Sequence, residues 1–398
     1  MRLRRLLLPG SDDWTRELEK VGADPGTWER LSRRNSVDTY RMGPLRPAAA
    51  SILKQCMLSG GADAIVARGT VTCTIEETDA LLVGTPRQLL AGCSSLRGQP
   101  FGLTSAADLI ESAVLHPPSL PEAVRCGGKV LHFSGAPIVM GILNVTPDSF
   151  SDGGRNLCPA DAVRNGLEMV ARGAAILDVG AESTRPGSAA VRPDVQLMRL
   201  RPVVEGLAEA GLQAVISVDT ANAGVAREML AAGAGMVNDI SSLSDPEMAG
   251  VVSEAGASLV LMHMKGTPGT MQQAPFYEDV MDEVYSFLEG RLTVAEASGL
   301  DRRSILVDPG IGFGKRLEDN VLLVRRLAEF RWLGCRVLLG HSRKSFLGQL
   351  TGMEDPADRD VATHAVTALM STSADVFRVH DVPGTVQALK AAGGVRGC

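Results

Sequence analysis

Closely spaced cysteines are missing from this sequence. Its 398 residues include seven cysteines, which are scattered along the chain without any C-x-x-C pair. Disulfide frameworks and zinc sites are built from cysteines at characteristic spacings, so this arrangement argues against both. Isolated cysteines fit a reducing environment, and we therefore expect a cytoplasmic protein.

The sequence also lacks a large excess of charge and a long apolar run. Its formal net charge of -6 provides no broad basic surface for a nucleic acid or an anionic membrane. The apolar stretch at residues 6–8 is shorter than the core of a secretory signal, and no other stretch is long enough to span a bilayer. We expect small-molecule partners, no nucleic acid and no membrane.

A linker rich in proline and glycine, residues 116–128, divides the chain into two regions. In the first region, strand-like runs at residues 64–67 and 80–83 alternate with helical patterns at residues 88–93 and 106–114. We predict an N-terminal α/β extension at residues 1–127, whose role the sequence does not reveal, and a larger domain at residues 128–398.

A pattern of apolar strand, polar loop and amphipathic helix repeats eight times in the larger domain. The predicted strands are residues 137–143, 175–179, 214–218, 235–237, 258–262, 305–307, 337–340 and 376–379. The helices between them include residues 160–172, 196–210, 222–232 and 317–330. Nearly continuous apolar strands are typical of parallel sheets covered on both faces. Eight units in about 260 residues favour an α/β fold of the (β/α)8 TIM barrel type over a doubly wound open sheet.

Polar residues follow every predicted strand. The run GILNVTPDSFSDGG, residues 141–154, includes the end of the first strand, and ESTRPG, residues 182–187, follows the second. The other strands lead into residues 219–220, 238–239, 262–264, 308–315, 341–345 and 378–381. In a barrel the carboxyl ends of all eight strands meet at one mouth, so these segments are expected to share a pocket.

Each polar group also has a purely structural interpretation. An acidic residue at a strand end often caps the next helix or ties a turn. For Asp219 this structural role and a role in the site are equally open, and for Asp239 the structural role is favoured. A turn role is the alternative for Asp152. His263, between two methionines, fits a satisfied core histidine, and residues 342–345 could be a solvated helix start.

The charges suggest one end of the pocket for an anion. Arg378 and His380 share a strand end, and with Asn144 and Thr184 they can hold a phosphate-rich group. An asparagine carbonyl together with phosphate oxygens suits Mg²⁺, which keeps few protein ligands and several waters.

The other polar residues suit a flat heterocycle. Asp219, Asn238, Asp308 and Lys344 offer donors and acceptors, and a carboxylate can take paired hydrogen bonds from an amino-pyrimidine edge. A buried carboxylate left without its partners is costly, which makes such recognition selective.

From about residue 130 onward the chain resembles dihydropteroate synthases, pterin-binding (β/α)8 enzymes of folate synthesis. The matching segments are residues 140–154, 178–187, 216–220, 237–240, 261–264, 308–315, 340–345 and 378–382. One such segment is a weak signal, but eight in order are specific. The extension before the linker corresponds to a long form in the family.

The resemblance implies a transferase that joins p-aminobenzoate to 6-hydroxymethyl-7,8-dihydropterin diphosphate, giving 7,8-dihydropteroate and diphosphate. It implies Mg²⁺, competition by sulfonamides and a homodimer. It also implies that two loops close over the site before the bond breaks, that the diphosphate then leaves, and that the closed loops shield a cationic pterin from water until the arylamine attacks.

The resemblance assigns residues to each part of the site. It implies catalytic roles for Asp152, Asp308, Lys344, Arg378 and His380, and a pterin site of Asp219, Asn238, Met262, Asp308 and Lys344. Diphosphate is assigned to Asn144, Thr184, Arg378 and His380, and Mg²⁺ to Asn144 and Asp152. The p-aminobenzoate site is assigned to Phe150, Ser183, Thr184, Arg185, Pro186, Phe313 and Ser345.

Two other functions are compatible with a pterin-binding barrel. A methyltetrahydrofolate–corrinoid methyltransferase would need neither a clamp for diphosphate nor the loop at residues 183–187, so Arg185, Lys344, Arg378 and His380 argue against it. A non-catalytic pterin-binding paralogue would be expected to lose loop residues first, and both loops are intact in this sequence.

Overall fold

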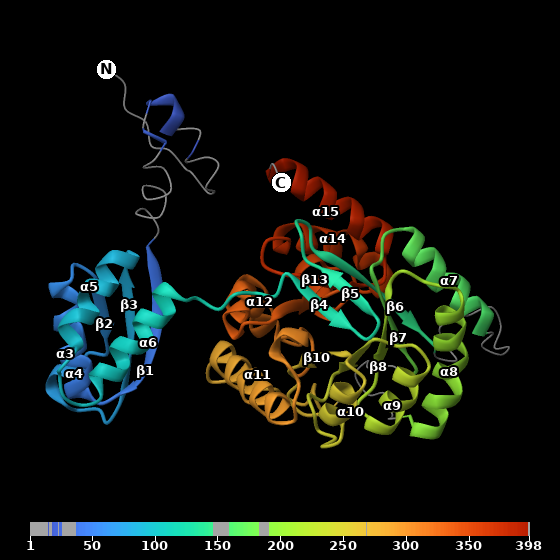
Figure 1. The fold of residues 1–398 in the computed structure, drawn as a ribbon, viewed down its shortest axis with the longest axis horizontal. Helices are drawn as coiled ribbons and strands as arrows, with labels where there is room; N and C mark the ends of the chain where they lie inside the picture. The colour runs from blue at the N-terminus through green and yellow to red at the C-terminus, as the bar shows by residue number, and fades with distance from the viewer. Residues whose placement is uncertain are drawn as a thin grey trace. The chain divides into compact units, whose positions relative to one another are not determined.

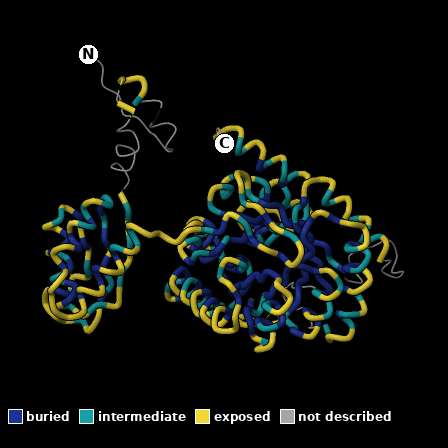
Figure 2. The backbone as a smooth tube through the Cα atoms, viewed as in Figure 1, coloured by how far each residue is buried: buried dark blue, intermediate teal, exposed yellow. Residues whose placement is uncertain are grey.

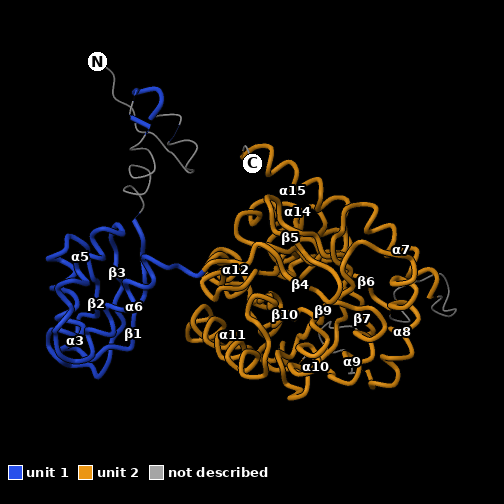
Figure 3. Tube along the Cα trace, viewed as in Figure 1, with its two compact units in different colours: residues 1–118 blue, residues 119–398 orange. Residues whose placement is uncertain are grey.

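The computed structural model describes residues 15, 18–22, 24–25, 37–145, 159–182, 191–267 and 269–396. The chain forms two compact units, residues 1–118 and residues 119–398 (Figure 3). Each unit has its own buried hydrophobic core, and the larger one belongs to the second unit (Figure 2). Within the described residues, no helix has the length and apolarity that crossing a membrane requires.

The first unit is a small α/β fold. Its elements are β1 (Asp38–Leu45), α3 (Pro47–Ser59), β2 (Asp63–Val66), α4 (Gly69–Thr72), β3 (Thr78–Gly84), α5 (Pro86–Leu96) and α6 (Leu103–Leu115). The strands form an antiparallel sheet in the order β1-β3-β2. One face of the sheet packs on the helices, where Ala80 and Leu82 share a buried cluster with Leu53 and Leu89. The elements predicted at residues 64–67, 80–83, 88–93 and 106–114 are confirmed as β2, β3, α5 and α6.

A hairpin of β4 (Ala123–Cys126) and β5 (Lys129–His132) begins the second unit. Val124 and Cys126 are buried together with apolar side chains near the amino ends of the barrel strands. Ser258 Oγ donates to Cys126 Sγ at 3.1 Å. These contacts place residues 119–127 with the barrel, so the division lies at residues 118/119 rather than at the predicted 127/128. The prolines of the linker are followed by a strand, which the sequence pattern did not reveal.

The second unit is a closed barrel of eight parallel strands (Figure 1). They are β6 (Ile138–Asn144), β7 (Ile176–Gly180), β8 (Val215–Asp219), β9 (Met236–Asp239), β10 (Ser258–Met262), β11 (Ile305–Asp308), β12 (Arg336–Leu339) and β13 (Val376–Val379). The barrel closes where β13 pairs with β6. The predicted TIM barrel is therefore confirmed, with every predicted strand present.

Helices surround the barrel. They are α7 (Pro159–Ala171), α8 (Pro193–Glu209), α9 (Ala223–Ala231), α10 (Met248–Glu254), α11 (Val280–Ala297), α12 (Leu317–Arg325), α13 (Ser345–Thr351), α14 (Asp360–Met370) and α15 (Val382–Arg396), with short 3-10 helices η2 (Arg302–Ser304), η3 (Leu327–Leu333) and η4 (Pro356–Arg359). The predicted helix at residues 317–330 is wrong in its second half, which forms η3. There Leu327, Phe330 and Leu333 are buried at a spacing of three, which matches the three residues per turn of a 3-10 helix.

The interior of the barrel changes character along its axis. The interior positions near the amino ends of the strands are apolar and include Met140, Ile176, Leu306, Leu338 and Val376. Side chains two positions further along each strand face the interior again, nearer the mouth. Those positions are Ile142, Asp178, Ser217, Asn238, Met262, Asp308, Gly340 and Arg378, and most of them are polar. The fold therefore seals one end of the barrel with hydrocarbon and concentrates polar groups at the other.

Candidate active site

Arg378 is held by two carboxylates at the mouth of the barrel. Its Nε donates to Asp178 Oδ2 at 2.6 Å, and its Nη2 donates to Asp219 Oδ2 at 2.9 Å. Asp178 is completely buried and also accepts from Ser217 Oγ at 2.6 Å and from Asn238 Nδ2 at 2.9 Å. Arg378 and Asn238 both donate to the carboxylate of Asp178, which therefore orients them. Hydrogen bonds to a charged group are stronger than hydrogen bonds between neutral groups.

Asp219 faces this network and does not cap a helix. The cap of α9 is Asn222, whose side chain accepts from Val225 N at 2.9 Å. Burial raises the pKa of Asp219 to about 7, although the charge of Arg378 lowers it. The structural alternative for Asp219 is thus excluded, and the carboxylate is available to a ligand that competes with Arg378.

Asp239, at the end of β9, does have the structural role that was favoured for it. Its carboxylate accepts from the backbone N–H groups of Ser241 at 2.9 Å and Leu243 at 2.7 Å. Both bonds tie the turn that follows β9, and Asp239 is completely buried. Of the two neighbouring acidic residues, only Asp219 therefore contacts the arginine network.

Asp308, at the end of β11, borders the same space as Arg378. Its Oδ1 accepts from Gly310 N at 2.7 Å. A Cβ added to Gly340 would lie 3.4 Å from Asp308 Oδ2 and 4.0 Å from Arg378 Cβ. Burial raises the pKa of Asp308 to about 6, although the bond from Gly310 and the charge of Lys344 lower it. This carboxyl group can therefore gain or lose a proton near neutral pH.

Lys344 immediately precedes α13 and lies over an aromatic ring. Its Nζ is 3.7 Å from the centroid of Phe313, a distance at which the ring face attracts a cation. Burial, followed by the charge of Arg378, lowers the pKa of Lys344 to about 8. Phe313 packs with Met262 and Met271, so an apolar wall stands beside the polar groups.

A buried lysine supports this wall. Lys315 Nζ donates to the carbonyl oxygens of Gly310 at 2.8 Å and Phe313 at 3.0 Å, and it lies 2.9 Å from His263 Nδ1. Burial lowers the pKa of Lys315 to about 7 and, with the charge of Lys315, lowers that of His263 to about 2. His263 is therefore a neutral acceptor, in agreement with its interpretation as a satisfied core histidine.

Asn144 and His380, two of the predicted anion-binding residues, also border the mouth. A Cβ added to Gly180 would lie 3.5 Å from Asp219 Cβ and 3.9 Å from Asn144 Oδ1, so both side chains border one space. His380 Nδ1 lies 3.0 Å from Ser342 Oγ, which itself accepts from His380 N at 3.2 Å. These contacts join the loop after β12 to the residue that follows β13.

Burial and the charges of two arginines lower the pKa of His380 to about 3. His380 is thus a neutral imidazole near pH 7 rather than a cation. An anion at this end would take its positive charge from Arg378 and a hydrogen bond from the imidazole.

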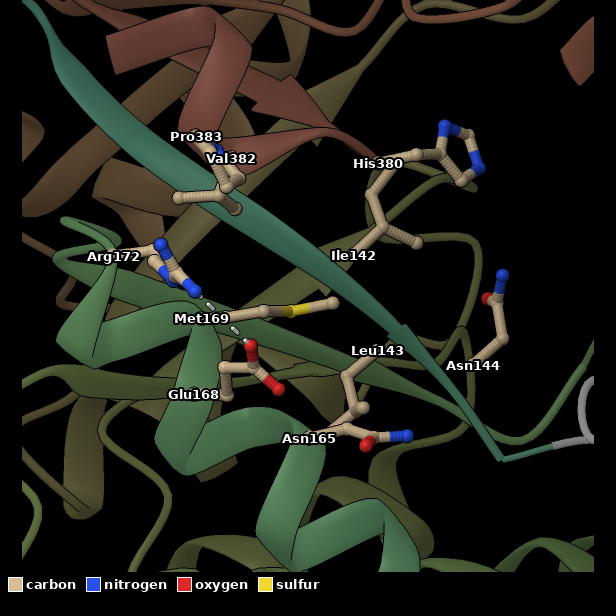
Figure 4. A pocket seen from close by; sticks show the side chains of 10 residues that line it. All are labelled: Ile142, Leu143, Asn144, Asn165, Glu168, Met169, Arg172, His380, Val382 and Pro383. Atoms are coloured by element: carbon tan, nitrogen blue, oxygen red, sulfur yellow. Dashed lines mark ion pairs between the residues drawn. The ribbon is translucent and has the colours of Figure 1, made fainter.

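Asn144 and His380 also line a cavity of about 380 Å³. Figure 4 shows both side chains on one side of β6, while Asn165, Glu168 and Arg172 project from α7 on the other. The cavity therefore extends the anion end of the mouth toward the surrounding helices.

The structure brings together the predicted residues that it describes. Asn144, Asp219, Asn238, Met262, Asp308, Phe313, Lys344, Arg378 and His380 lie around the mouth, and Ser345 begins α13 beside Lys344. The remaining predicted residues, Phe150, Asp152, Ser183, Thr184, Arg185 and Pro186, lie outside the described residues. Among the described residues, no three His, Cys, Asp or Glu side chains form a metal-binding group.

Sequence reasoning did not single out Asp178 and Lys315 as members of the site. The available signal for Asp178 was a carboxylate inside an otherwise apolar strand, since a buried charge needs partners. Lys315 follows a glycine-rich turn, and its burial could not be read from that pattern.

Comparison with known proteins follows the same outline. The family model described as "Pterin binding enzyme" matches residues 140–380. Dihydropteroate synthase of Escherichia coli K12 is 46% identical over 257 residues, which cover 64% of this chain and 90% of that protein. The probable bifunctional folylpolyglutamate synthase/dihydropteroate synthase of Haloferax volcanii is 36% identical over 391 residues. That match covers 96% of this chain, so it includes the first unit. The chain spans only 46% of the length of that relative.

Solved structures show the same similarity. The dihydropteroate synthase of Xanthomonas albilineans with 4-aminobenzoic acid superposes with a TM-score of 0.66 at 44% identity, covering 70% of this chain and 99% of that one. The Yersinia pestis dihydropteroate synthase in a sulfonamide complex gives a TM-score of 0.65 at 39% identity, covering 69% of this chain and 100% of that one.

Proposed function

The chain belongs to the dihydropteroate synthases within the pterin-binding enzymes, and from this premise we propose that it makes 7,8-dihydropteroate in folate synthesis. The substrates would be p-aminobenzoate and 6-hydroxymethyl-7,8-dihydropterin diphosphate, and diphosphate would leave. The observation that carries this proposal is the position of Arg378, which lies between the acidic residues of one half of the mouth and the anion-binding residues of the other.

The acidic half suits the pterin ring. Asp219 and Asp308 can accept from the amino and ring N–H groups of a pterin, and Asn238 can offer its carbonyl oxygen because its amide N–H donates to Asp178. Met262, beside Phe313, would pack on the face of the ring. These residues recognise an aromatic edge that is rich in donors, which is the pattern of an amino-pyrimidine.

The opposite half suits the diphosphate. Arg378 would supply charge, and the neutral imidazole of His380 would supply a hydrogen bond. Asn144 could contribute one oxygen ligand to Mg²⁺, with Asp152 as a second, and a single amide oxygen facing the mouth fits an ion that keeps most of its waters. When bound, the ion would neutralise charge on the leaving group.

The proposed reaction exchanges one bond of the pterin methylene for another. The C–O bond breaks and its electron pair leaves with the diphosphate, whose charge Arg378 and His380 stabilise. Asp308, with its pKa near neutrality, can share a proton with the ring and so favour the cationic pterin. The arylamine nitrogen then forms the C–N bond and loses a proton.

The p-aminobenzoate would lie beside the apolar wall. Phe313 and Ser345 are described members of this proposed subsite, and Lys344 over the Phe313 ring marks its border with the pterin. Sulfonamides are proposed to compete here, and the homodimer and the cytoplasmic location remain proposals as well. The role of the first unit stays open.

The direct test is turnover by the purified full chain. With both substrates and Mg²⁺, we expect dihydropteroate and diphosphate to appear in equal amounts, measured by chromatography and a coupled diphosphate assay. The reaction without p-aminobenzoate is the control. Tight binding of the pterin without release of diphosphate would instead identify a non-catalytic pterin-binding protein.

A further inference from the structure

Asp178 connects four strands of the barrel at the mouth, and it lies behind the residues proposed to bind substrates. It is completely buried in β7, and its partners come from three other strands, β8, β9 and β13. A buried carboxylate is costly unless its oxygens are satisfied, and here both oxygens accept.

The two oxygens of Asp178 have different tasks. Oδ1 accepts only from Ser217 Oγ, whereas Oδ2 accepts from both Arg378 Nε and Asn238 Nδ2. Oδ2 is therefore shared by one residue of the proposed diphosphate half and one of the proposed pterin half. Resting on the proposed function, we propose that Asp178 is a positioning residue that orients both halves of the site at once.

The effect on Asn238 is to fix which end of its amide faces the pterin. A carboxylate only accepts, so the amide N–H group of Asn238 must point to Asp178 and the carbonyl oxygen must point elsewhere. Without this anchor the amide could turn and present a donor. A ring edge rich in N–H groups would then meet a donor instead of an acceptor.

The effect on Arg378 is to keep its guanidinium between the two halves. With Nε held by Asp178 and Nη2 by Asp219, the remaining N–H groups can face the diphosphate. Without Asp178, Arg378 would keep Asp219 as its carboxylate partner at the mouth. It would then occupy the carboxylate that the pterin needs and would aim less well at the anion.

Asp178→Ala tests this role through binding to the intact chain. Titration calorimetry would measure 6-hydroxymethylpterin and magnesium diphosphate separately. We expect both dissociation constants to rise by about tenfold or more, although Asp178 is not proposed to contact either ligand. The reason is that Arg378 and Asn238, which are proposed to contact the ligands, both lose the carboxylate that orients them. The matched control is Asp239→Asn, another completely buried carboxylate beside the mouth that ties only its own turn. It should lower thermal stability while both dissociation constants stay within twofold.

Asp178→Asn covers the case in which the alanine variant does not fold. Its carbonyl oxygen can take the place of Oδ2, and its amide can donate to Ser217 Oγ, so the hydrogen bonds persist while Arg378 loses one of its two carboxylate charges. We expect the KM for the pterin diphosphate to change less than threefold and kcat to fall by about tenfold. The reason is that Arg378, which is proposed to stabilise the leaving diphosphate, depends on the charge of Asp178.

Three results separate the outcomes. If the alanine variant binds both ligands within twofold of the wild type, or if the asparagine variant leaves kcat unchanged, Asp178 only serves the fold. If only one ligand is weakened, Asp178 does not link the two halves. A wild-type chain that binds both ligands without turnover would refute the proposed function and leave the binding test of Asp178 intact.

Discussion

Arg378 Nη2 lies 2.9 Å from Asp219 Oδ2, so two residues proposed to bind different ends of one substrate form an ion pair with each other. Neither charge is left unpaired in the buried mouth, where an isolated charge would be costly. A pterin at Asp219 would release the arginine toward the diphosphate, and a diphosphate would release the carboxylate toward the pterin. Each part of the substrate therefore prepares the site for the other.

Replacing Asp219 should affect the pterin more than the diphosphate. Asp219→Asn removes a charged acceptor and frees one N–H group of Arg378. We expect the dissociation constant of 6-hydroxymethylpterin to rise by about tenfold or more, since a hydrogen bond to a charged group contributes about 1.5–3 kcal/mol. Diphosphate affinity should stay the same or improve. Calorimetric titration of each ligand provides the measurement, and unchanged pterin affinity would contradict the placement of the ring.

Lys344 should be needed for turnover. Lys344→Ala removes the cation over Phe313 at the proposed border between the two substrates. We expect kcat/KM to fall by at least about a hundredfold, because about 2.7 kcal/mol of stabilisation in the transition state corresponds to that factor. Lys265→Ala is the control, since Lys265 lies on the loop after β10 and pairs with Glu283 at the surface. A rate within a few-fold of the wild type for Lys344→Ala would show that the lysine lies outside the site.

The raised pKa of Asp308 should appear in the pH dependence of stability. A carboxyl group with a pKa of about 6 in the folded chain, against the ordinary 3.8, holds more protons when folded than when unfolded between those values. The free energy of unfolding should therefore fall as pH rises from about 4 to about 6.

Asp308→Asn should remove this component of the pH dependence. Between pH 4 and pH 7 the free energy of unfolding of the variant should rise relative to that of the wild type by up to about 3 kcal/mol, which is the equivalent of about two pKa units. Urea unfolding at a series of pH values measures the difference, in which contributions of unrelated groups cancel. A difference between the two proteins that does not change with pH would show that the carboxyl group titrates normally.

Lys315 should stabilise the loop that carries Phe313. Lys315→Ala leaves the carbonyl oxygens of Gly310 and Phe313 and the nitrogen of His263 without their donor. We expect a loss of about 2–4 kcal/mol in the free energy of unfolding, since each buried unsatisfied group costs about 1–3 kcal/mol and some relaxation follows. Lys390→Ala, on the exposed face of α15, should change it by less than about 0.5 kcal/mol. Equal stability of the two variants would remove Lys315 from this role.

The architecture was predictable because its signal is local. A strand buried on both faces must be apolar along its whole length, and eight such runs separated by helices leave few alternatives to a barrel. The ends of the strands were predicted equally well, since Asn144, Asp219, Asp308 and Arg378 each interrupt an apolar run. The 3-10 helix at Leu327–Leu333 and the hairpin strand β4 were missed because their patterns are too short to identify by period.

The sequence by itself determined the eight strands, the side of the barrel on which polar residues collect, and the family to which the chain belongs. Only the tertiary structure decided that Asp178 accepts from Arg378 and Asn238, that Ser342 contacts the His380 ring, and that Lys315 is buried against His263. The physical reason is that apolar periodicity is a property of neighbouring residues. The partner and protonation state of a buried polar group depend instead on side chains that the barrel brings together from distant parts of the chain.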